Sequence, residues 1–191
     1  MIKRAQLLIL LISLSGCSTV SDLATGYTEI FGNIKNFAFK ESLDISQEEI
    51  DSFPYSFAMA RFGRASFSRI VLASYQNGVF EWVSADGTSL YTLDGKIIKT
   101  IGLSNDVHIA GYIPGCKSQD YIVNFIEPKL FNINLESKFT IDNDICEEVV
   151  SYIDINWKTN NQYIYQDKRV TYSNQRIHPF LPELEIYFYI K

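Results

Sequence analysis

Cys17 follows directly on a short apolar run, where its thiol can act as the acceptor of a lipid. The apolar residues 7–14 come after two basic residues, and they are too few for a membrane-spanning helix, which takes about 20 residues. A charged start, a brief apolar segment and then small residues are typical of a secretory signal peptide. Residues 14–17, Leu-Ser-Gly-Cys, resemble a bacterial lipobox, in which the cysteine sulfur receives a diacylglycerol before cleavage. We therefore expect residues 1–16 to be removed and Cys17 to be lipidated; the alternative is an ordinary signal peptide with an incidental cysteine.

A lipid on Cys17 makes residues 17–20 an anchor and leaves residues 21–191 as one domain. Several acyl chains, such as palmitate, hold a protein on a membrane far more firmly than one chain does. Apart from the leader, no segment offers 18 uninterrupted apolar residues, so the sequence predicts a tethered chain that does not span the bilayer. Ser18 follows the anchor, whereas Asp there resembles an inner-membrane retention signal. We therefore predict attachment to the outer membrane, with the domain facing the periplasm.

Cys116 and Cys146 are the two other cysteines of the chain. In an oxidising compartment they can form one disulfide, which the loop-entropy model values at roughly 3–4 kcal/mol. Two buried free thiols are the alternative, because the sequence does not show how close their Cα atoms lie. A zinc site is not expected, since there is no Cys-x-x-Cys pair and the two histidines lie far apart in the sequence.

The charge of the chain excludes one class of partner. It carries 17 Lys and Arg against 22 Asp and Glu, a formal net charge of −5. An acidic domain lacks the positive charge that attracts a phosphate backbone, so no nucleic-acid partner is expected.

The side chains that could support catalysis do not form a recognisable constellation. Nucleophilic hydrolysis needs a nucleophile with His and a carboxylate, and the Gly-x-Ser-x-Gly motif of one common route is absent from the sequence. His108 lies in a strand-like stretch and His178 precedes a proline, so both are interpreted as ordinary surface histidines. The acidic run 142–148 could suit glycoside hydrolysis, but adjacent acids are more typical of a solvated turn. We therefore expect no enzyme, no catalytic residue, no metal and no cofactor.

Two helices are predicted near the start of the mature chain. Apolar residues recur at three-to-four spacing from Val20 to Phe37, which predicts an amphipathic helix over about residues 21–35. Ser46-Gln47-Glu48-Glu49 has the spacing of a capping box, which predicts a short second helix that Pro54 ends.

After Pro54 the pattern becomes one of short strands. β-Branched and aromatic residues dominate, and the Asp86-Gly87 and Asp94-Gly95 pairs between apolar flanks are strong hairpin signals. Residues 184–190 alternate apolar and amphipathic side chains, as in an antiparallel strand with one wet face. About ten such strands without strand–helix alternation predict an all-β, mostly antiparallel fold: a curled sheet, sandwich or barrel, with the N-terminal amphipathic helix packed on it.

Aromatic residues make up 14% of the chain, and some of them could bind sugar rings. Tyr187 and Tyr189 oppose the apolar face of the last predicted strand. Tyr163 and Tyr165 share the same parity on the preceding hairpin and could lie beside them. The alternative is a polar outer face that binds no ligand.

Several landmarks resemble the YjbF/GfcB family of bacterial lipoproteins. They lie in order at residues 43–56 (LDISQEEIDSFPYS), 78–82 (GVFEW), 93–103 (LDGKIIKTIGL), 156–158 (NWK) and 172–175 (YSNQ). The sequence departs from the family at residues 166–169, where members usually carry a glycine in the hairpin, and at residues 106–127. The resemblance implies a small all-β lipoprotein that helps to make or export an exopolysaccharide or group 4 capsule, without catalytic residues.

Three functions therefore stay open. The first is a non-enzymatic accessory factor at the outer membrane, which contacts the polysaccharide or an export protein. The second is a periplasmic carrier of a lipid or acyl chain, and the third is a polysaccharide hydrolase. A deep apolar cavity would favour the carrier, whereas a shallow groove lined by tyrosines would favour sugar.

Overall fold

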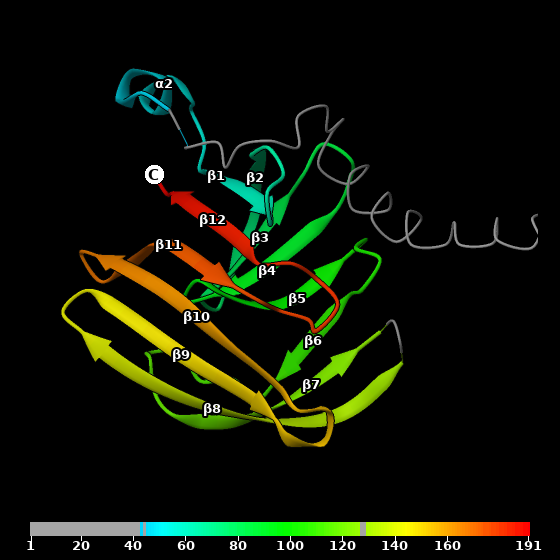
Figure 1. The fold of residues 1–191 in the computed structure, drawn as a ribbon. Coiled ribbons are helices and arrows are strands. Elements are labelled where there is room, and N and C mark those ends of the chain that lie inside the picture. Colours follow the sequence, from blue (N-terminus) through cyan, green and yellow to red (C-terminus); the bar gives the residue numbers. More distant parts are fainter. Residues whose placement is uncertain (1–42, 44, 127–128) are drawn as a thin grey trace, which may run out of the picture.

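The computed structural model describes residues 43, 45–126 and 129–191 (Figure 1). The expected signal peptide, the Cys17 anchor and the expected amphipathic helix at 21–35 lie outside these residues. The described elements are α2 (Gln47–Ser52), β1 (Phe57–Phe62), β2 (Ser68–Gln76), β3 (Val79–Val83), β4 (Ser89–Leu93), β5 (Lys96–Ile101), β6 (Val107–Ala110), β7 (Gln119–Phe125), β8 (Leu130–Asp142), β9 (Ile145–Tyr152), the 3-10 turn η1 (Ile153–Ile155), β10 (Trp157–Gln166), β11 (Arg169–Gln175) and β12 (Leu184–Tyr189).

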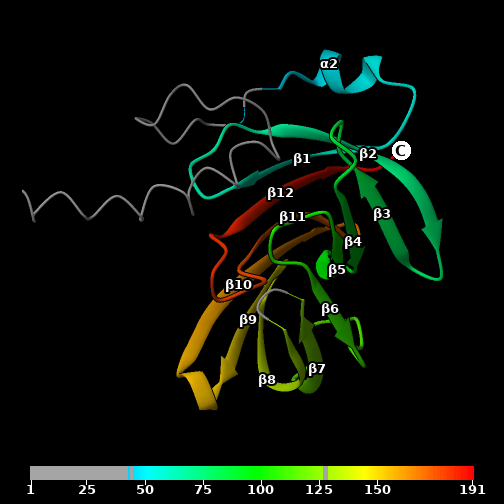
Figure 2. The same ribbon diagram turned by 90° about the vertical axis from the view of Figure 1, so that its right-hand side faces the viewer.

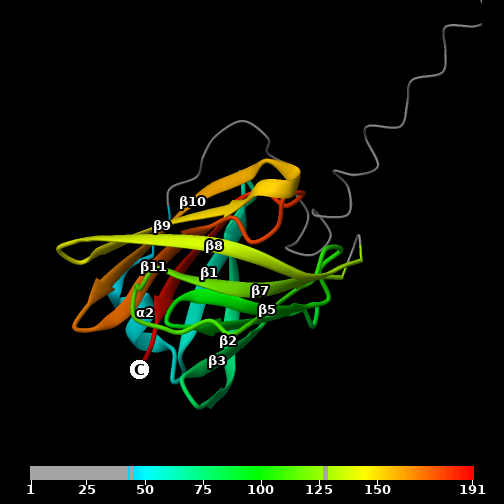
Figure 3. The same cartoon turned by 90° about the horizontal axis from the view of Figure 1, so that it is seen from below.

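The twelve strands form one closed antiparallel barrel. Each strand pairs with the next along the chain, and the last strand, β12, pairs with β1 to close the circle. Figures 2 and 3 show the strands wrapping round a common interior. Closure gives every strand two neighbours, so no described strand presents an open sheet edge. The predicted all-β antiparallel class is confirmed, and of the three shapes expected the chain adopts the barrel.

The predicted capped helix at Ser46 is confirmed. The Ser46 hydroxyl oxygen accepts a hydrogen bond from the Glu49 backbone N–H at 3.1 Å. The helix ends at Ser52, with Phe53 as its C-cap directly before Pro54. Figure 2 shows α2 above the wall formed by β1, β2 and β12. Lys191 Nζ, just beyond β12, donates to the Asp51 carbonyl at 3.2 Å, which ties the helix to this wall.

Both predicted Asp-Gly turns occur. Asp94 and Gly95 have φ angles of 53° and 77° and join β4 to β5, as in the two-residue turns that favour this pair. Gly95 also lies against Val170, since a Cβ there would come within 2.5 Å of Val170 Cγ1. Gly87 lies in the turn between β3 and β4, where its N–H donates to the Ser84 carbonyl at 3.1 Å.

The β10–β11 hairpin contains residues 166–169, where the sequence was expected to depart from the family. Gln166 pairs with Arg169, so only Asp167 and Lys168 form the turn. Their φ angles are 51° and 65°, a region that L-residues other than Asn and Asp seldom adopt. The short turn leaves Lys168 and Arg169 exposed at one end of the barrel.

The interior of the barrel is filled by side chains that alternate along each strand. On β12, Leu184, Ile186 and Phe188 are buried in the core, which confirms the apolar face predicted for this strand. Trp82 lies fully buried between the walls, and its indole N–H donates to the Thr92 hydroxyl at 2.9 Å. Burial of such apolar side chains is a major favourable contribution to the stability of the barrel.

Candidate functional site

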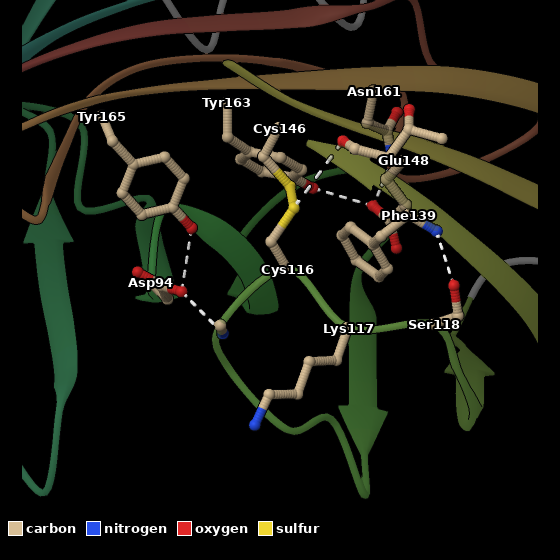
Figure 4. Close-up of a disulfide and its surroundings, with 12 residues drawn as sticks. Asp94, Cys116, Lys117, Ser118, Phe139, Cys146, Glu148, Asn161, Tyr163 and Tyr165 are labelled. Carbon is tan, nitrogen blue, oxygen red and sulfur yellow. Dashed lines mark hydrogen bonds between the residues drawn. A yellow bond between two sulfur atoms is a disulfide. The ribbon is translucent and has the colours of Figure 1, made fainter. Parts of the chain in front are cut away.

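The Cys116–Cys146 disulfide predicted from the sequence is present, with a Cα–Cα distance of 6.2 Å (Figure 4). It ties the loop between β6 and β7 to the start of β9. The same loop is held by Asp94, whose carboxylate accepts hydrogen bonds from the Gly115 N–H at 2.8 Å and the Tyr165 hydroxyl at 2.9 Å. The loop is therefore fixed against one end of the barrel at two points.

A charged pair lies inside the barrel behind this loop. Both carboxylate oxygens of Glu148, on β9, lie 2.7 Å from the Lys96 ammonium nitrogen on β5. The Glu148 side chain has no exposed surface, and that of Lys96 is 3% exposed. Such a pair is tolerated only when every remaining lone pair is satisfied.

Four neutral side chains complete the coordination of this carboxylate. They donate to Glu148 at distances of 2.7–3.3 Å, from Ser137, Asn161, Tyr163 and Tyr121. The Lys96 ammonium also lies 4.8 Å from the centroid of the Tyr121 ring. Lys96, Glu148 and these four donors are called the interior cluster below.

The electrostatics of the interior cluster favour the ion pair. Burial alone would raise the pKa of Glu148, but the Lys96 charge and the donated hydrogen bonds outweigh it and lower that pKa. Burial lowers the pKa of Lys96, and the Glu148 charge opposes this shift. Burial, followed by the Glu148 charge, raises the pKa of both Tyr121 and Tyr163. Both phenols therefore stay protonated and able to donate.

The predicted platform of four tyrosines does not exist as one surface. Tyr163 is only 2% exposed and belongs to the interior cluster, so its predicted place on the wet face was wrong. Tyr163 pairs with Ser173, which pairs with the inward-facing Ile186, and this register turns Tyr163 into the barrel. Tyr165 is half-buried near Asp94, also away from Tyr187 and Tyr189.

Tyr187 and Tyr189 instead lie in a groove on the outer face of the barrel. The groove has a volume of about 990 Å³ and runs between α2 and strands β10–β12. Its lining includes a third tyrosine, Tyr172, whose ring centroid is 4.8 Å from that of Tyr187. Side-chain amides of Gln47, Gln162 and Gln166 border it. We call it the outer groove.

A second, smaller polar cluster supports the floor of the outer groove. Arg61 donates to Glu185 through Nε at 2.8 Å and lies under the Phe67 ring, 4.1 Å from its centroid. The other carboxylate oxygen of Glu185 accepts from the Tyr187 hydroxyl at 3.2 Å and from that of Tyr172 at 3.4 Å. Burial, followed by the Glu185 charge, raises the pKa of both phenols, so they remain donors.

The other residues considered from the sequence are dispersed. His108 is exposed, as expected, whereas His178 is 1% exposed and packs against Phe125, so its predicted surface position was wrong. Asp142 and Asp144 are exposed at the β8–β9 hairpin. Within the described part of the chain, no group of three or more His, Cys, Asp or Glu could hold a metal ion. Nor is any helix there long and apolar enough to cross a membrane.

Fold and site together define an all-β barrel protein with a buried ion pair, a disulfide-fixed loop and an aromatic outer groove. The family described as "Group 4 capsule polysaccharide lipoprotein gfcB, YjbF" matches residues 25–111. This match confirms the predicted resemblance to the YjbF family over these residues. The match ends at residue 111, before the disulfide and the outer groove's tyrosines.

A solved structure supports the fold independently. The crystal structure of the hypothetical lipoprotein YmcC from Escherichia coli (K12) is similar to this chain with a TM-score of 0.61. It shares 17% identity, and the alignment covers 75% of this chain and 88% of that one. At this identity the likeness shows the fold alone. No curated protein matches the chain.

Proposed function

We propose that this chain is a lipid-anchored, non-enzymatic accessory factor in the assembly or export of a surface polysaccharide. The match to a family described as a capsule polysaccharide lipoprotein carries this proposal. The lipobox at residues 14–17 supports attachment through Cys17, and Ser18 supports sorting to the outer membrane with the barrel in the periplasm.

The shape of the barrel limits how it can contact other components of an export system. Each described strand has a neighbour on both sides, although β5 and β6 pair only at Lys99 and His108, so the barrel offers little edge to which a partner could add a strand. We therefore expect contact through side chains on the outer wall or at the barrel ends. The outer groove is the best candidate for a glycan, because rings of Tyr187 and Tyr189 offer flat apolar faces and the bordering glutamines offer both donors and acceptors.

The first prediction concerns the anchor. A strain that lacks this gene should lose secreted and surface-bound polysaccharide, and the intact gene should restore it. Cys17→Ser should restore much less, because the thiol is the lipid acceptor. Quantified polysaccharide and immunoblots of membrane fractions check this. Unchanged polysaccharide in the deletion strain would contradict the proposed function; full rescue by Cys17→Ser would contradict only the anchor.

The second prediction concerns the outer groove. Tyr187→Leu combined with Tyr189→Leu should weaken binding to the purified polysaccharide by about tenfold, since each aromatic contact contributes roughly 0.5–1.5 kcal/mol beyond its area. Titration calorimetry with the polysaccharide of the producing strain measures the loss. Tyr91→Leu is the matched control, because this half-buried tyrosine bonds to Glu81 on another part of the wall. Equal affinity for all these forms would exclude the groove as a glycan site.

A further inference from the structure

One end of the barrel opens into a pocket that the proposed function does not use. Its volume is about 670 Å³, within the range of roughly 300–1,000 Å³ for small-molecule sites. The turns β2–β3, β4–β5 and β10–β11 lie around its mouth, together with residues 114–115 of the disulfide-fixed loop. We call it the mouth pocket.

The wall of the mouth pocket is apolar. It is formed by side chains from five strands and from the residue after β12, namely Leu72, Phe80, Trp82, Leu93, Val170, Phe188 and Ile190. The hydroxyls of Ser56 and Thr92 also line it, but both are already bonded. The Thr92 hydroxyl accepts from the Trp82 indole at 2.9 Å, and the Ser56 hydroxyl accepts from the Lys191 N–H at 2.9 Å. A polar ligand would gain little from this wall, whereas an alkyl chain would be fully accommodated.

The rim of the mouth pocket is basic. Lys168 and Arg169 lie on the exposed β10–β11 turn, where the compact two-residue geometry places them beside the opening. Asp94, the acidic side chain of the lining, is bonded to the Gly115 N–H and the Tyr165 hydroxyl. Two exposed cations above an apolar cavity are complementary to an anionic head group on an alkyl chain.

Large apolar side chains also stand exposed near this opening. Tyr75 at the end of β2 is 60% exposed, and Ile113 in the disulfide-fixed loop is 59% exposed. Tyr75 lines the mouth pocket itself. Exposed apolar groups next to basic ones are typical of surfaces that meet the boundary of a lipid layer, from which an amphiphile could enter.

We propose that the mouth pocket binds a single-chain anionic amphiphile of the fatty-acid class. The alkyl chain lies against the half-buried side chains of Leu72 and Phe80, and the carboxylate lies at the rim beside Lys168 and Arg169. This site adjoins the outer groove, and Arg169, Val170 and Phe188 are among the residues that line both. The proposal does not depend on the role in polysaccharide export.

Fluorescence energy transfer from the protein's tryptophans to dansyl-undecanoate tests the proposal. Because the strands close round their own core, the unlipidated mature chain, residues 18–191, is a suitable sample. We expect one probe per chain, displaced by dodecanoate. Affinity in the series from octanoate to dodecanoate should rise by about fourfold per added methylene until the cavity is filled. Displacement by polysaccharide fragments but not by dodecanoate would overturn the proposal in favour of a sugar.

Two sets of variants locate the ligand. Leu72→Trp fills the cavity and should weaken probe binding by at least tenfold, whereas Ile153→Trp, at an 83% exposed position at the opposite end, should not. Lys168→Gln with Arg169→Gln should weaken dodecanoate binding roughly fivefold and leave dodecanol unchanged. Lys138→Gln with Lys158→Gln, both exposed and outside the mouth, is the matched control for charge.

If Leu72→Trp does not fold, the Lys168→Gln, Arg169→Gln double variant and its control still test the proposed site. Equal dodecanoate affinity in the Lys168/Arg169 pair and its control would overturn the assignment of the head group. Probe binding that does not saturate at one per chain, or that persists in a folded Leu72→Trp protein, would overturn the pocket itself.

Discussion

Replacing Glu148 with glutamine is expected to lower the free energy of unfolding by about 3–5 kcal/mol. The Lys96 ammonium lies 2.7 Å from both oxygens of this carboxylate and is almost fully buried. Glutamine keeps the shape of the side chain but leaves a buried cation without its counter-charge. Four neutral donors also lose a charged acceptor, and hydrogen bonds to charged groups are roughly twice as strong as neutral ones.

Urea denaturation followed by Trp fluorescence measures this loss. Glu136→Gln is the matched control, because Glu136 pairs with Lys138 at 2.9 Å on the surface, where the Lys138 side chain is 70% exposed. That control should cost less than about 0.5 kcal/mol. Lys96→Met with Glu148→Gln should recover much of the lost stability, since no unpaired charge remains. A cost below about 1 kcal/mol for Glu148→Gln alone would contradict the role of the ion pair.

The same pair predicts how stability depends on pH. The folded state lowers the pKa of Glu148 from its ordinary value of 4.5, so an unfolded chain binds its proton more readily. The stability contributed by this group is therefore present above about pH 4.5 and is lost as the pH falls through the lowered folded pKa. The loss on acidification should be steeper in the natural protein than in the Lys96→Met, Glu148→Gln double variant.

The parts of the fold that are local in the sequence could be predicted from it. The Asp94-Gly95 turn, the Ser46 cap and the alternation along β12 each depend on residues within a few positions of one another. The closure of the barrel could not be predicted in this way. It depends on pairing between β1 and β12, where Phe57 lies opposite Tyr189, and no local pattern specifies such a distant neighbour.

The candidate site was predicted only in part, for the same reason. Tyr163 and Tyr187 both stand at alternating positions, but the face each one takes depends on strand register and on bulges such as that between Ile164 and Tyr165. The sequence around Glu148 predicts a solvated acidic run. Glu148 lies two positions from Cys146 and from Val150 on the same strand, so all three share one face. Because Cys146 and Val150 lie in the core, this spacing was the sequence signal that Glu148 points inward. Its partner Lys96 is 52 positions away, and the sequence gives no direct sign of that contact.

Removing the disulfide, by Cys116→Ser with Cys146→Ala, is expected to cost about 3–4 kcal/mol of stability in the loop-entropy model. The bond joins residues 30 positions apart and closes a loop that contains β7 and β8, so its loss frees a large part of the unfolded chain. Denaturation with and without a thiol reductant measures the cost. Reductant should shift the natural protein toward the variant and leave the variant unchanged.

The disulfide variant should also change the mouth pocket while the rest of the barrel keeps its strands. The Asp94 contact to Gly115 and the Ser118 contact to Phe139 would remain, but the covalent tie would be lost, and amide exchange should speed up most in residues 111–118. Binding of dansyl-undecanoate should weaken as this loop loosens, because Pro114 and Gly115 form part of the pocket. Unchanged exchange in this loop would show that packing alone holds it. Faster exchange together with weaker probe binding would mean that the mouth pocket needs the disulfide in order to bind its ligand. Disulfides persist in the periplasm, which is the compartment in which the anchored barrel is proposed to act.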